Sequence, residues 1–443
     1  MEHELYGGLP RDFKLDALEQ VLEDPEKFET HPALSLTAKA LMAELADIPT
    51  EDTTLRHSPI SFEVYGQDGI EPGAMHQMYV AAKLPIARAA ALMPDAHQGY
   101  GLPIGGVLAT EQAVIPYAVG VDIGCRMALS VFDIKREAFE RMNRELALAL
   151  REHTTFGAGR GPDDPWDDPV LEREEFRYLP IAKRLKDKAW KQIGSSGGGN
   201  HFVEFGLVKL TDPDNEWGLP VGEYMGLLSH SGSRGLGAGI ANHYTQIAMQ
   251  QTRLPKVAKH LAWLDMGSEA GMEYWAAMNL AGDYASACHD HIHRRMARAL
   301  GSRPLFRVEN HHNFAWKERL ADGQEVIVHR KGATPAGKGV LGIIPGSMVD
   351  PGFIVRGKGN ANAIQSASHG AGRVLSRSKA KRSITRSALN KLLAEKRVTL
   401  IGGGLDEAPI AYKDIRQVMA YQQDLVDVVG SFHPKIVRMA KDK

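Results

Sequence analysis

His369 stands in a run of small residues that reads Ser366-Ala-Ser-His-Gly-Ala-Gly-Arg373. Glycine and alanine leave an imidazole unobstructed and let the backbone come close to a ligand. The basic run Arg377–Arg386, with five cations and no anion, follows at once. An accessible histidine beside positive charge suits attack on a phosphorylated electrophile. We therefore predict that His369 is a nucleophile and that the basic run forms a local phosphate-binding surface.

Five further side chains are of the types that bind transition metals. Asp122 and Cys125 lie three residues apart in a tight turn, and His201, His230 and His312 lie in segments rich in Gly, Ser and Asn. Carboxylate, thiolate and imidazole suit Mn, Fe, Co or Zn better than Mg or Ca. A thiolate can bridge two ions, and a two-metal site clamps phosphoryl oxygens. Each histidine alone is more often a hydrogen-bonded core or loop residue, so these spacings shift that balance only modestly.

A second group of histidines competes for a metal. His289, His291 and His293 lie on the longest expected helix, and His289 and His293 are spaced to chelate an ion on one face. No glutamate completes a His-Glu-x-x-His motif, and the surrounding residues are charged. We interpret this cluster as a solvated helix face or an RNA contact, and Cys288 beside it as helix core.

Three glycine-rich loops can present backbone N–H groups to phosphates, namely Gly194–Asn200, Arg234–Gly239 and Gly402–Gly404. None has the spacing of a Walker A or Rossmann loop, and glycine is equally a turn residue. The run Lys183–Lys191, with five cations and one Asp, is interpreted as a solvated face, as most charge runs are.

Composition limits the class of protein that can hold these residues. The chain has 443 residues, of which 43% are apolar and 24% charged, and its net charge of −1 excludes a general polycation. Two cysteines without a CxxC motif fit a reducing compartment. No signal peptide begins the chain and no apolar run reaches about 18 residues. We expect a soluble cytoplasmic protein that does not enter a membrane.

Periodicity and turn signals predict the elements that position the site. Glycine-rich polar loops are spread from residue 93 to residue 404, which indicates one site in one domain and not a string of modules. Strands and helices do not alternate strictly, so we predict an α+β fold with mixed sheets flanked by helices and one central cleft. Helices are expected at Leu34–Ile48, Ala74–Ala91, Lys135–Glu152, from Ile240, at Trp263–Leu300, Lys379–Lys396 and Tyr412–Val429, and strands at Ala113–Val119, Met127–Phe132, Arg307–Phe314 and Glu325–His329.

The domain boundaries follow from the same pass along the chain. Residues 1–60 are expected to form an N-terminal accessory segment, and residues 61–443 the main domain. Within that domain, residues 153–181 are rich in Gly, Pro and Asp and are expected to form an exposed loop or insert.

Eight of these segments, in the same order, resemble the RtcB family of RNA ligases. They are Pro94–Gly106, Gly120–Cys125, Gly199–Glu204, His230–Gly235, His311–Asn313, Gly342–Met348, Ser368–Arg373, and Asp406–Pro409 with Tyr412–Asp414. The resemblance covers about residues 60–430 and implies a single RtcB-like ligase domain.

The resemblance also implies roles for single residues. Asp122, Cys125 and His201 would hold one Mn²⁺ ion, and Cys125, His230 and His312 a second. His369 would attack GTP to form a histidine–GMP intermediate. The residues expected to contact GTP are Asn200, His201, Phe202, Val203, Glu204, His312, Asn313, Pro345, Gly346, Ser347, Met348, Gly370, Ala371 and Gly372.

The implied reaction joins RNA ends in tRNA splicing or RNA repair. GMP would pass from His369 to an RNA 3′-phosphate, and a 5′-hydroxyl would then displace it. A 2′,3′-cyclic phosphate would first be opened to the 3′-phosphate. The partners are therefore GTP and RNA with these ends, and no protein partner is indicated.

Three positions depart from the family pattern, and two other functions compete. Arg126 follows Cys125 where the family usually has glycine, and we expect it to contact phosphate or crowd the site. Gly352 replaces a side chain that often touches the nucleotide, and Arg438 or Lys441 is the candidate to replace a C-terminal lysine.

The alternatives are a two-metal phosphoesterase or nuclease, and a non-catalytic RNA-end or GTP-binding relative.

Overall fold

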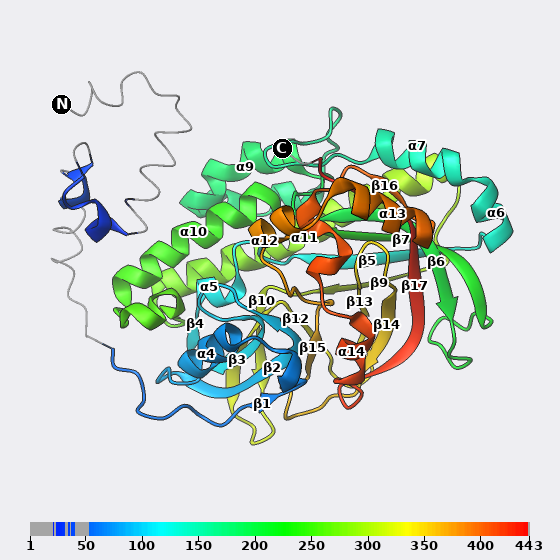
Figure 1. Ribbon diagram of the computed structural model, residues 1–443. Helices are drawn as coiled ribbons and strands as arrows, with labels where there is room; N and C mark the ends of the chain where they lie inside the picture. Colours follow the sequence, from blue (N-terminus) through cyan, green and yellow to red (C-terminus); the bar gives the residue numbers. More distant parts are fainter. Residues whose placement is uncertain (1–20, 22–23, 32–33, 36, 40–52, 442–443) are drawn as a thin grey trace.

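The computed structural model describes residue 21, residues 24–31, 34–35, 37–39 and residues 53–441 (Figure 1). The predicted helix at Leu34–Ile48 lies largely outside these residues. None of the helices described combines the length and the apolar character needed to cross a membrane.

The larger of two main sheets has eight strands, and all but one of its pairs are antiparallel. The order is β13-β14-β17-β6-β7-β5-β9, and β16 pairs with β17 in parallel. The two end strands approach each other, because Ile343 N of β13 donates to Asn310 Oδ1 of β9 at 2.9 Å. The sheet is thus nearly closed. Its strands are β5 (Arg126–Phe132), β6 (Phe202–Leu210), β7 (Gly222–Ser231), β9 (Phe306–His311), β13 (Leu341–Ile344), β14 (Gly352–Gly357), β16 (Thr399–Ile401) and β17 (Val426–Met439).

A five-stranded sheet of order β1-β2-β3-β11-β10 lies beside it. Two strand pairs, β4–β8 and β12–β15, complete the described strands, and β15 leads directly into His369. The bounds are β1 (Glu63–Val64), β2 (Ala87–His97), β3 (Ile104–Thr110), β4 (Ala113–Val114), β8 (Leu264–Asp265), β10 (Phe314–Arg319), β11 (Glu325–Lys331), β12 (Ala333–Pro335) and β15 (Ser366–Ser368).

Helices cover the outside of the two sheets. Figure 1 shows α9, α10 and α11 stacked side by side above the five-stranded sheet, and α13 beside β16 and the C-terminal strand. The α-helices are α4 (Pro72–Ala81), α5 (Pro116–Val119), α6 (Arg136–Arg141), α7 (Asn143–His153), α8 (Glu175–Tyr178), α9 (Pro180–Gln192), α10 (Arg234–Gln251), α11 (Glu269–Leu300), α12 (Arg377–Ser383), α13 (Arg386–Lys396) and α14 (Ile415–Ala420). The 3₁₀ helices are η1 (Pro25–Phe28), η2 (Gln67–Gly69), η3 (Pro169–Glu172), η4 (Lys256–Leu261), η5 (Leu405–Glu407) and η6 (Pro409–Ala411).

The predicted α+β class with mixed sheets and flanking helices is confirmed. The strands predicted at Met127–Phe132 and Glu325–His329 are present, and the long helix ends at Gly301 as expected. That glycine has a φ of 60°, the left-handed conformation that commonly ends a helix. The same helix begins at Glu269 and not at Trp263, because Ser268 caps it by accepting a hydrogen bond from Gly271 N.

Two expected helices turn out to be half strand. The helix predicted at Ala74–Ala91 ends at Ala81, and the alanine-rich run after it forms the buried strand β2. The helix predicted at Tyr412–Val429 ends at Ala420, and β17 begins at Val426. Alanine and valine runs fit a buried strand as well as a helix, so neighbouring strands decided the outcome.

Smaller corrections concern element boundaries. The strand predicted at Ala113–Val119 stops at Val114, because Pro116 begins the short helix α5. The predicted helix Lys379–Lys396 is two helices, divided at Thr385, whose side chain caps α13. The helix expected from Ile240 already begins at Arg234. The helix predicted at Lys135–Glu152 is likewise divided at Met142.

The segments at the two predicted boundaries are packed against the domain. Leu55, Ile60 and Phe62 lie against the apolar cluster formed around α4 and β2, and Ile60 N donates to Ala82 O at 3.0 Å. The expected exposed loop 153–181 contains η3 and α8, whose side chains Val170, Leu171 and Phe176 are buried. The division at residue 60 stays a prediction.

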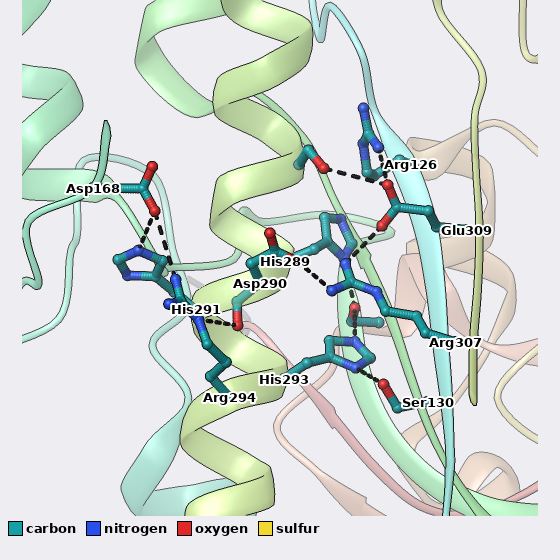
Figure 2. A network of polar contacts seen from close by, with 12 residues as sticks. Arg126, Ser130, Asp168, His289, Asp290, His291, His293, Arg294, Arg307 and Glu309 are labelled. Atoms are coloured by element: carbon teal, nitrogen blue, oxygen red, sulfur yellow. Dashed lines mark hydrogen bonds and ion pairs between the residues drawn. The ribbon is translucent and has the colours of Figure 1, made fainter. Parts of the chain in front are cut away.

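The histidines of α11 are buried, so the interpretation as a solvated face is wrong. His289 Nδ1 and His293 Nε2 lie 2.6 and 2.7 Å from the Oγ of Ser229, and Ser130 Oγ lies 2.7 Å from His293 Nδ1. His291 contacts Asp168 at 2.9 Å on the other side of the helix (Figure 2). Serine and aspartate partners compensate for burial of the imidazoles. Cys288 is fully buried, as predicted.

Arg330 is a buried charge that supports the strand before His369. Its guanidinium binds both carboxylate oxygens of Glu318 at 2.6 and 3.0 Å, Ser366 Oγ at 2.7 Å and Ile364 O at 2.9 Å. The side chain is 1% exposed, so its removal leaves Glu318 without its counter-charge.

We expect Arg330→Met to lower the free energy of unfolding by about 3 kcal/mol, the low end for a broken buried pair, because Glu318 keeps some solvent contact. The urea midpoint measures this loss. Arg319→Met removes the exposed pair with Glu325 and should change the stability by about 0.5 kcal/mol or less. Equal midpoint shifts in the two variants would contradict the assignment.

Candidate active site and metal centre

A pocket of about 760 Å³ lies between the two sheets. Its lining comes from positions as far apart as Glu71 and Met439, and includes the loops before β5 and after β15. All five predicted metal ligands and His369 line it. The spread of glycine-rich loops along the sequence therefore corresponds to a single cavity in space.

The five predicted ligands converge in two groups that share one thiol. Cys125 Sγ lies 3.2 Å from His230 Nε2 and 3.5 Å from His201 Nε2. His230 Nε2 lies 3.2 Å from His312 Nε2, and Asp122 Oδ2 lies 2.9 Å from His201 Nε2. Within each of the two groups, Cys125–His230–His312 and Asp122–Cys125–His201, the ligand atoms lie within 4.8 Å of one another.

Local backbone structure explains why these side chains meet. Cys125 N donates to Asp122 O, which closes the turn predicted between two strands, and Gly124 in that turn has a φ of 65°. His230 pairs with Phe202 across β7 and β6, so it lies beside the turn that carries His201. His312 N donates to Cys125 O at 2.8 Å, which fixes the third histidine.

The chemistry of the donor set fits a pair of divalent cations. His230 Nδ1 contacts Asn200 O at 3.1 Å, which leaves its Nε2 as a free lone pair, and burial lowers the pKa of His230 to about 3. Burial raises the pKa of the Cys125 thiol, and the charge of Asp122 adds to that rise. Several lone pairs that face one another in a buried cluster are unfavourable without a cation between them.

His369 is oriented by a buried carboxylate that sequence reasoning had given no role. The His369 Nδ1–H donates to Asp95 Oδ2 at 2.6 Å, and the backbone N of His369 donates to the same oxygen at 3.2 Å. Burial raises the pKa of Asp95, but the hydrogen bond and charge of His369 outweigh it, so the net shift is downward. Nε2 of His369 is therefore left to react. The ring lies 4.8 Å from that of His312.

Asp95 is itself held in place from both sides. Lys413 Nζ donates to Pro94 O and Ala96 O at 2.9 and 2.7 Å, and His97 Nδ1 contacts Asp95 O at 3.0 Å. The orientation of His369 thus depends on a contact that spans 274 positions of the chain.

We expect Asp95→Asn to slow any reaction of His369 by roughly 10² to 10⁴-fold, because the amide holds the imidazole less well in the tautomer with a free Nε2. Single-turnover rates of covalent nucleotide attachment to His369 measure this. Metal content should stay unchanged, because Asp95 contacts no predicted metal ligand. An equal rate in both proteins would show that Asp95 has only a packing role.

Positive charge near His369 is largely neutralised. Arg373 Nη2 donates to Asp406 O at 2.6 Å, and Nη1 lies 3.4 Å from Glu407. Arg377 forms ion pairs with Asp406 and Glu407. The guanidinium groups thus brace the loop after His369 against η5. The cations that remain at the surface lie further along α12, at Lys379 and Arg382.

The predicted nucleotide contacts line the same pocket with one exception. Val203 is fully buried on the opposite face of β6, where it packs with Phe205 and Ile436. Its neighbours on the strand face the pocket, since successive residues alternate between faces. The lining residues of the predicted set are Asn200, His201, Phe202, Glu204, His312, Asn313, Pro345, Gly346, Ser347, Met348, Gly370, Ala371 and Gly372.

Glu204 has the properties of a ligand-binding carboxyl group. It is 4% exposed, lines the pocket, and has no hydrogen-bond partner in the part of the chain that the structure describes. Burial raises its pKa well above the usual value. A buried carboxyl group without a partner in the protein favours a ligand that supplies hydrogen bonds.

Arg126 does not enter the pocket, contrary to the expectation that it would contact phosphate or crowd the site. Its Nη1 donates to Glu309 Oε1 at 2.5 Å (Figure 2). Its Nη2 donates to Gly282 O at 3.2 Å. Arg126 is the first residue of β5 and Cys125 directly precedes it, so their side chains point to opposite sides of the extended chain. Glu309 also pairs with Arg307, which in turn contacts Asp290 of α11.

The other two departures affect the far end of the pocket. Gly352 lines it, and a Cβ there would lie 3.2 Å from Pro345 Cα. Arg438 turns away, donating to Leu150 O and lying over the Phe156 ring, so it does not replace a nucleotide-binding lysine. Met439 lines the pocket in its place, and Lys441 does not line it.

The glycine-rich and basic segments have separate positions. Asn200, at the end of the first glycine loop, lines the pocket, whereas Arg234–Gly239 forms the first turns of α10. Lys183–Lys191 lies on α9, with its cations facing outward as predicted. The turn at Gly199 lies beside Arg377 of α12.

Sequence reasoning missed several residues of the pocket. Lys331 lines it and donates from Nζ to Tyr100 O and Tyr117 O, and burial lowers its pKa to about 7. Asp350 lines it and accepts from Ser347 Oγ. Asp95, which lies behind His369, is part of the segment Pro94–Gly106, and an acidic residue in a glycine- and proline-rich segment was the only local signal for it.

Comparisons with known proteins agree over nearly all of this domain. Residues 77–178 and 173–440 match the family described as tRNA-splicing ligase RtcB. The RNA-splicing ligase RtcB of Escherichia coli K12 is 34% identical over 406 residues, which cover 85% of this chain and 96% of the relative. The RNA-splicing ligase RtcB of Mycobacterium tuberculosis is 33% identical over 81% of this chain and 98% of its own length. The tRNA-splicing ligase RtcB of Thermococcus kodakarensis is 28% identical over 88% and 96%.

Proposed function

Because this chain belongs to the RtcB family of RNA-splicing ligases, we propose that it joins RNA 3′-phosphate ends to 5′-hydroxyl ends with GTP and two Mn²⁺ ions. The observation that carries this proposal is the position of His369. Its Nε2 is left free by Asp95, and its ring lies 4.8 Å from that of a predicted metal ligand.

Different residues of the pocket have different roles in the proposed reaction. The metal ions, when bound to the cysteine, aspartate and histidines, supply positive charge beside the phosphoryl oxygens. In this proposal the carboxylate of Glu204 accepts hydrogen bonds from the N–H groups of a purine such as guanine. Phe202 and Met348 are apolar residues that also line the pocket. The glycines after His369 allow the nucleotide phosphates to approach the backbone.

The proposed reaction has three steps. His369 Nε2 forms a bond to the α-phosphorus of GTP, and pyrophosphate leaves as the P–O bond breaks. An oxygen of the RNA 3′-phosphate then attacks the same phosphorus, and His369 leaves. Finally the RNA 5′-hydroxyl attacks the 3′-phosphorus, its proton is released, and GMP departs. A 2′,3′-cyclic phosphate is first hydrolysed by water to the 3′-phosphate.

RNA reaches the pocket over the surface of α12. Lys379 and Arg382 are exposed there and have no carboxylate partner among the described residues. Their positive charge suits contacts with phosphates of the RNA backbone. This placement supports the earlier assignment of a phosphate-binding surface to residues 377–386, with Arg377 itself bound to acidic residues.

The test is sealing of a nicked RNA stem-loop that carries a 3′-phosphate and a 5′-hydroxyl. With GTP and Mn²⁺ we expect more than one joined product per protein molecule, and no joining without GTP. Parallel reactions with Mg²⁺, Co²⁺ and Zn²⁺ identify the active ion. Removal of the terminal phosphate without joining would favour the two-metal phosphoesterase, and tight binding without joining would favour a non-catalytic relative.

A further inference from the structure

Tyr100 places an exposed aromatic ring at the edge of the pocket. It is 68% exposed, although Tyr residues normally bury much of their ring, and it lines the same cavity as His369. Nothing in the proposed handling of GTP or metal uses it. Large exposed aromatic side chains beside a binding pocket commonly contact a ligand or partner.

The backbone that carries Tyr100 is firmly held. Gln77 exchanges two hydrogen bonds with Gly99, from Nε2 to Gly99 O at 2.5 Å and from Gly99 N to Oε1 at 3.0 Å. Gln98 N donates to Glu71 Oε1 at 2.6 Å, and Lys331 Nζ donates to Tyr100 O at 2.5 Å. The ring is thus exposed on a fixed support and not on a loop end with few contacts.

Two neighbouring rings fix the position of the Tyr100 ring. Its centroid lies 6.3 Å from that of Tyr117 at an angle of 83°, and 6.1 Å from that of His260 at 75°. Both contacts are edge-to-face, a favoured geometry for aromatic pairs. They orient the ring while leaving it 68% exposed, so its position is set before any ligand binds.

Two consecutive residues connect the backbone of Tyr100 with the surroundings of His369. Lys331, which binds Tyr100 O, is followed by Gly332, where a Cβ would lie 3.2 Å from His369 Cε1. Lys331 and Gly332 therefore contact the backbone of Tyr100 and lie close to the His369 ring, respectively. In RNA, a base and its 3′-phosphate are separated by one sugar, so a nucleotide whose 3′-phosphate reaches His369 brings its own base to another part of the same pocket, which Tyr100 also lines.

We propose that Tyr100 stacks on the nucleobase of the RNA nucleotide that carries the 3′-phosphate. This inference rests on the proposed ligase function and adds a base-binding subsite to it. An unpaired base at an RNA end exposes its π face, and proteins that bind RNA ends commonly stack such bases on aromatic side chains. Stacking tolerates every base, so this subsite would hold the end without selecting its sequence.

The experiment measures joining by Tyr100→Ala, Tyr100→Phe and the wild-type chain, each divided by the yield of covalent GMP adduct of the same protein. For Tyr100→Ala we expect the KM for RNA to rise about 5- to 150-fold with a smaller change in kcat, as loss of one stacked base predicts. Tyr100→Phe should restore the KM to within about threefold, since the ring and not the hydroxyl makes the contact. Tyr178→Ala, which removes another exposed tyrosine on α8, should leave it unchanged.

A substrate without a base at the 3′-phosphate nucleotide separates stacking from a packing role. With this RNA, the KM of the wild-type chain should rise by the same factor by which Tyr100→Ala raises the KM for normal RNA. The KM of Tyr100→Ala should rise little further on the RNA without the base. If Tyr100→Ala raised the KM equally for both RNAs, relative to the wild-type chain, the proposal would be overturned. It would also be overturned if the effect of Tyr100→Ala disappeared only with an RNA whose 5′-hydroxyl nucleotide lacks its base. If the wild-type chain forms no adduct and joins no RNA, the ligase function has failed and not this subsite alone.

Discussion

Replacing His369 by alanine is expected to abolish covalent attachment of GMP when the protein is incubated with α-labelled GTP and Mn²⁺. Alanine removes the imidazole that Asp95 orients, and with it the nitrogen that would form the bond to phosphorus. Loss of a covalent nucleophile costs on the order of 10⁴-fold or more in rate. RNA joining should fall in parallel, because each later step depends on the activated end.

The control for this variant is His57→Ala, which removes an exposed histidine whose described contact is with Ser58. It should label and join like the wild-type chain. A labelled adduct that persists in His369→Ala would overturn the proposed role. Joining that persists without any adduct would also contradict it, since the proposed reaction activates the RNA end only through that adduct.

Cys125→Ala is expected to remove both metal ions, not one. The thiol belongs to both candidate ligand groups, at 3.2 Å from His230 Nε2 and 3.5 Å from His201 Nε2. A shared thiolate holds two cations close together by offsetting their repulsion. Joining should fall on the order of 10³-fold or more, because phosphoryl transfer then lacks its electrostatic stabilisation.

Metal analysis of protein reconstituted with Mn²⁺ measures this directly. The wild-type chain should hold about two ions per molecule, and Cys125→Ala far fewer than one. Cys288→Ala replaces the other cysteine, which lies in the helix core and away from the candidate ligands, and should keep the full metal content. Two ions retained in Cys125→Ala would show that the thiol does not bridge them.

The sequence permitted a large part of the site to be predicted because local composition limits what a residue can do. Glycine-rich segments around His369 and His201 indicated room for a ligand, and the turn between Asp122 and Cys125 indicated convergence. The structure brings all five predicted ligands and His369 into one pocket. The α+β class was equally accessible, since strands and helices do not alternate strictly along the chain.

The direction in which a side chain points could not be predicted from the sequence in the same way. Val203 and Arg126 were assigned by position in a motif, yet strand alternation turns both away from the pocket. The histidines of α11 occur in a charged sequence, and only the packing of β5 and β7 against that helix shows that they are buried beside Ser229 and Ser130.

The sequence by itself determined which chemical groups this protein has for the proposed reaction: an unobstructed imidazole, a mixed set of candidate metal ligands and a basic segment. It did so because side-chain chemistry and turn propensity are local properties. Only the tertiary structure decided how those groups act. The contact between Asp95 and His369 joins β2 to the residue that follows β15, across 274 positions. The backbone oxygen of Tyr100 is bound by Lys331, which lies 231 positions away in the chain. Such contacts depend on how the sheets pack, which no local spacing encodes.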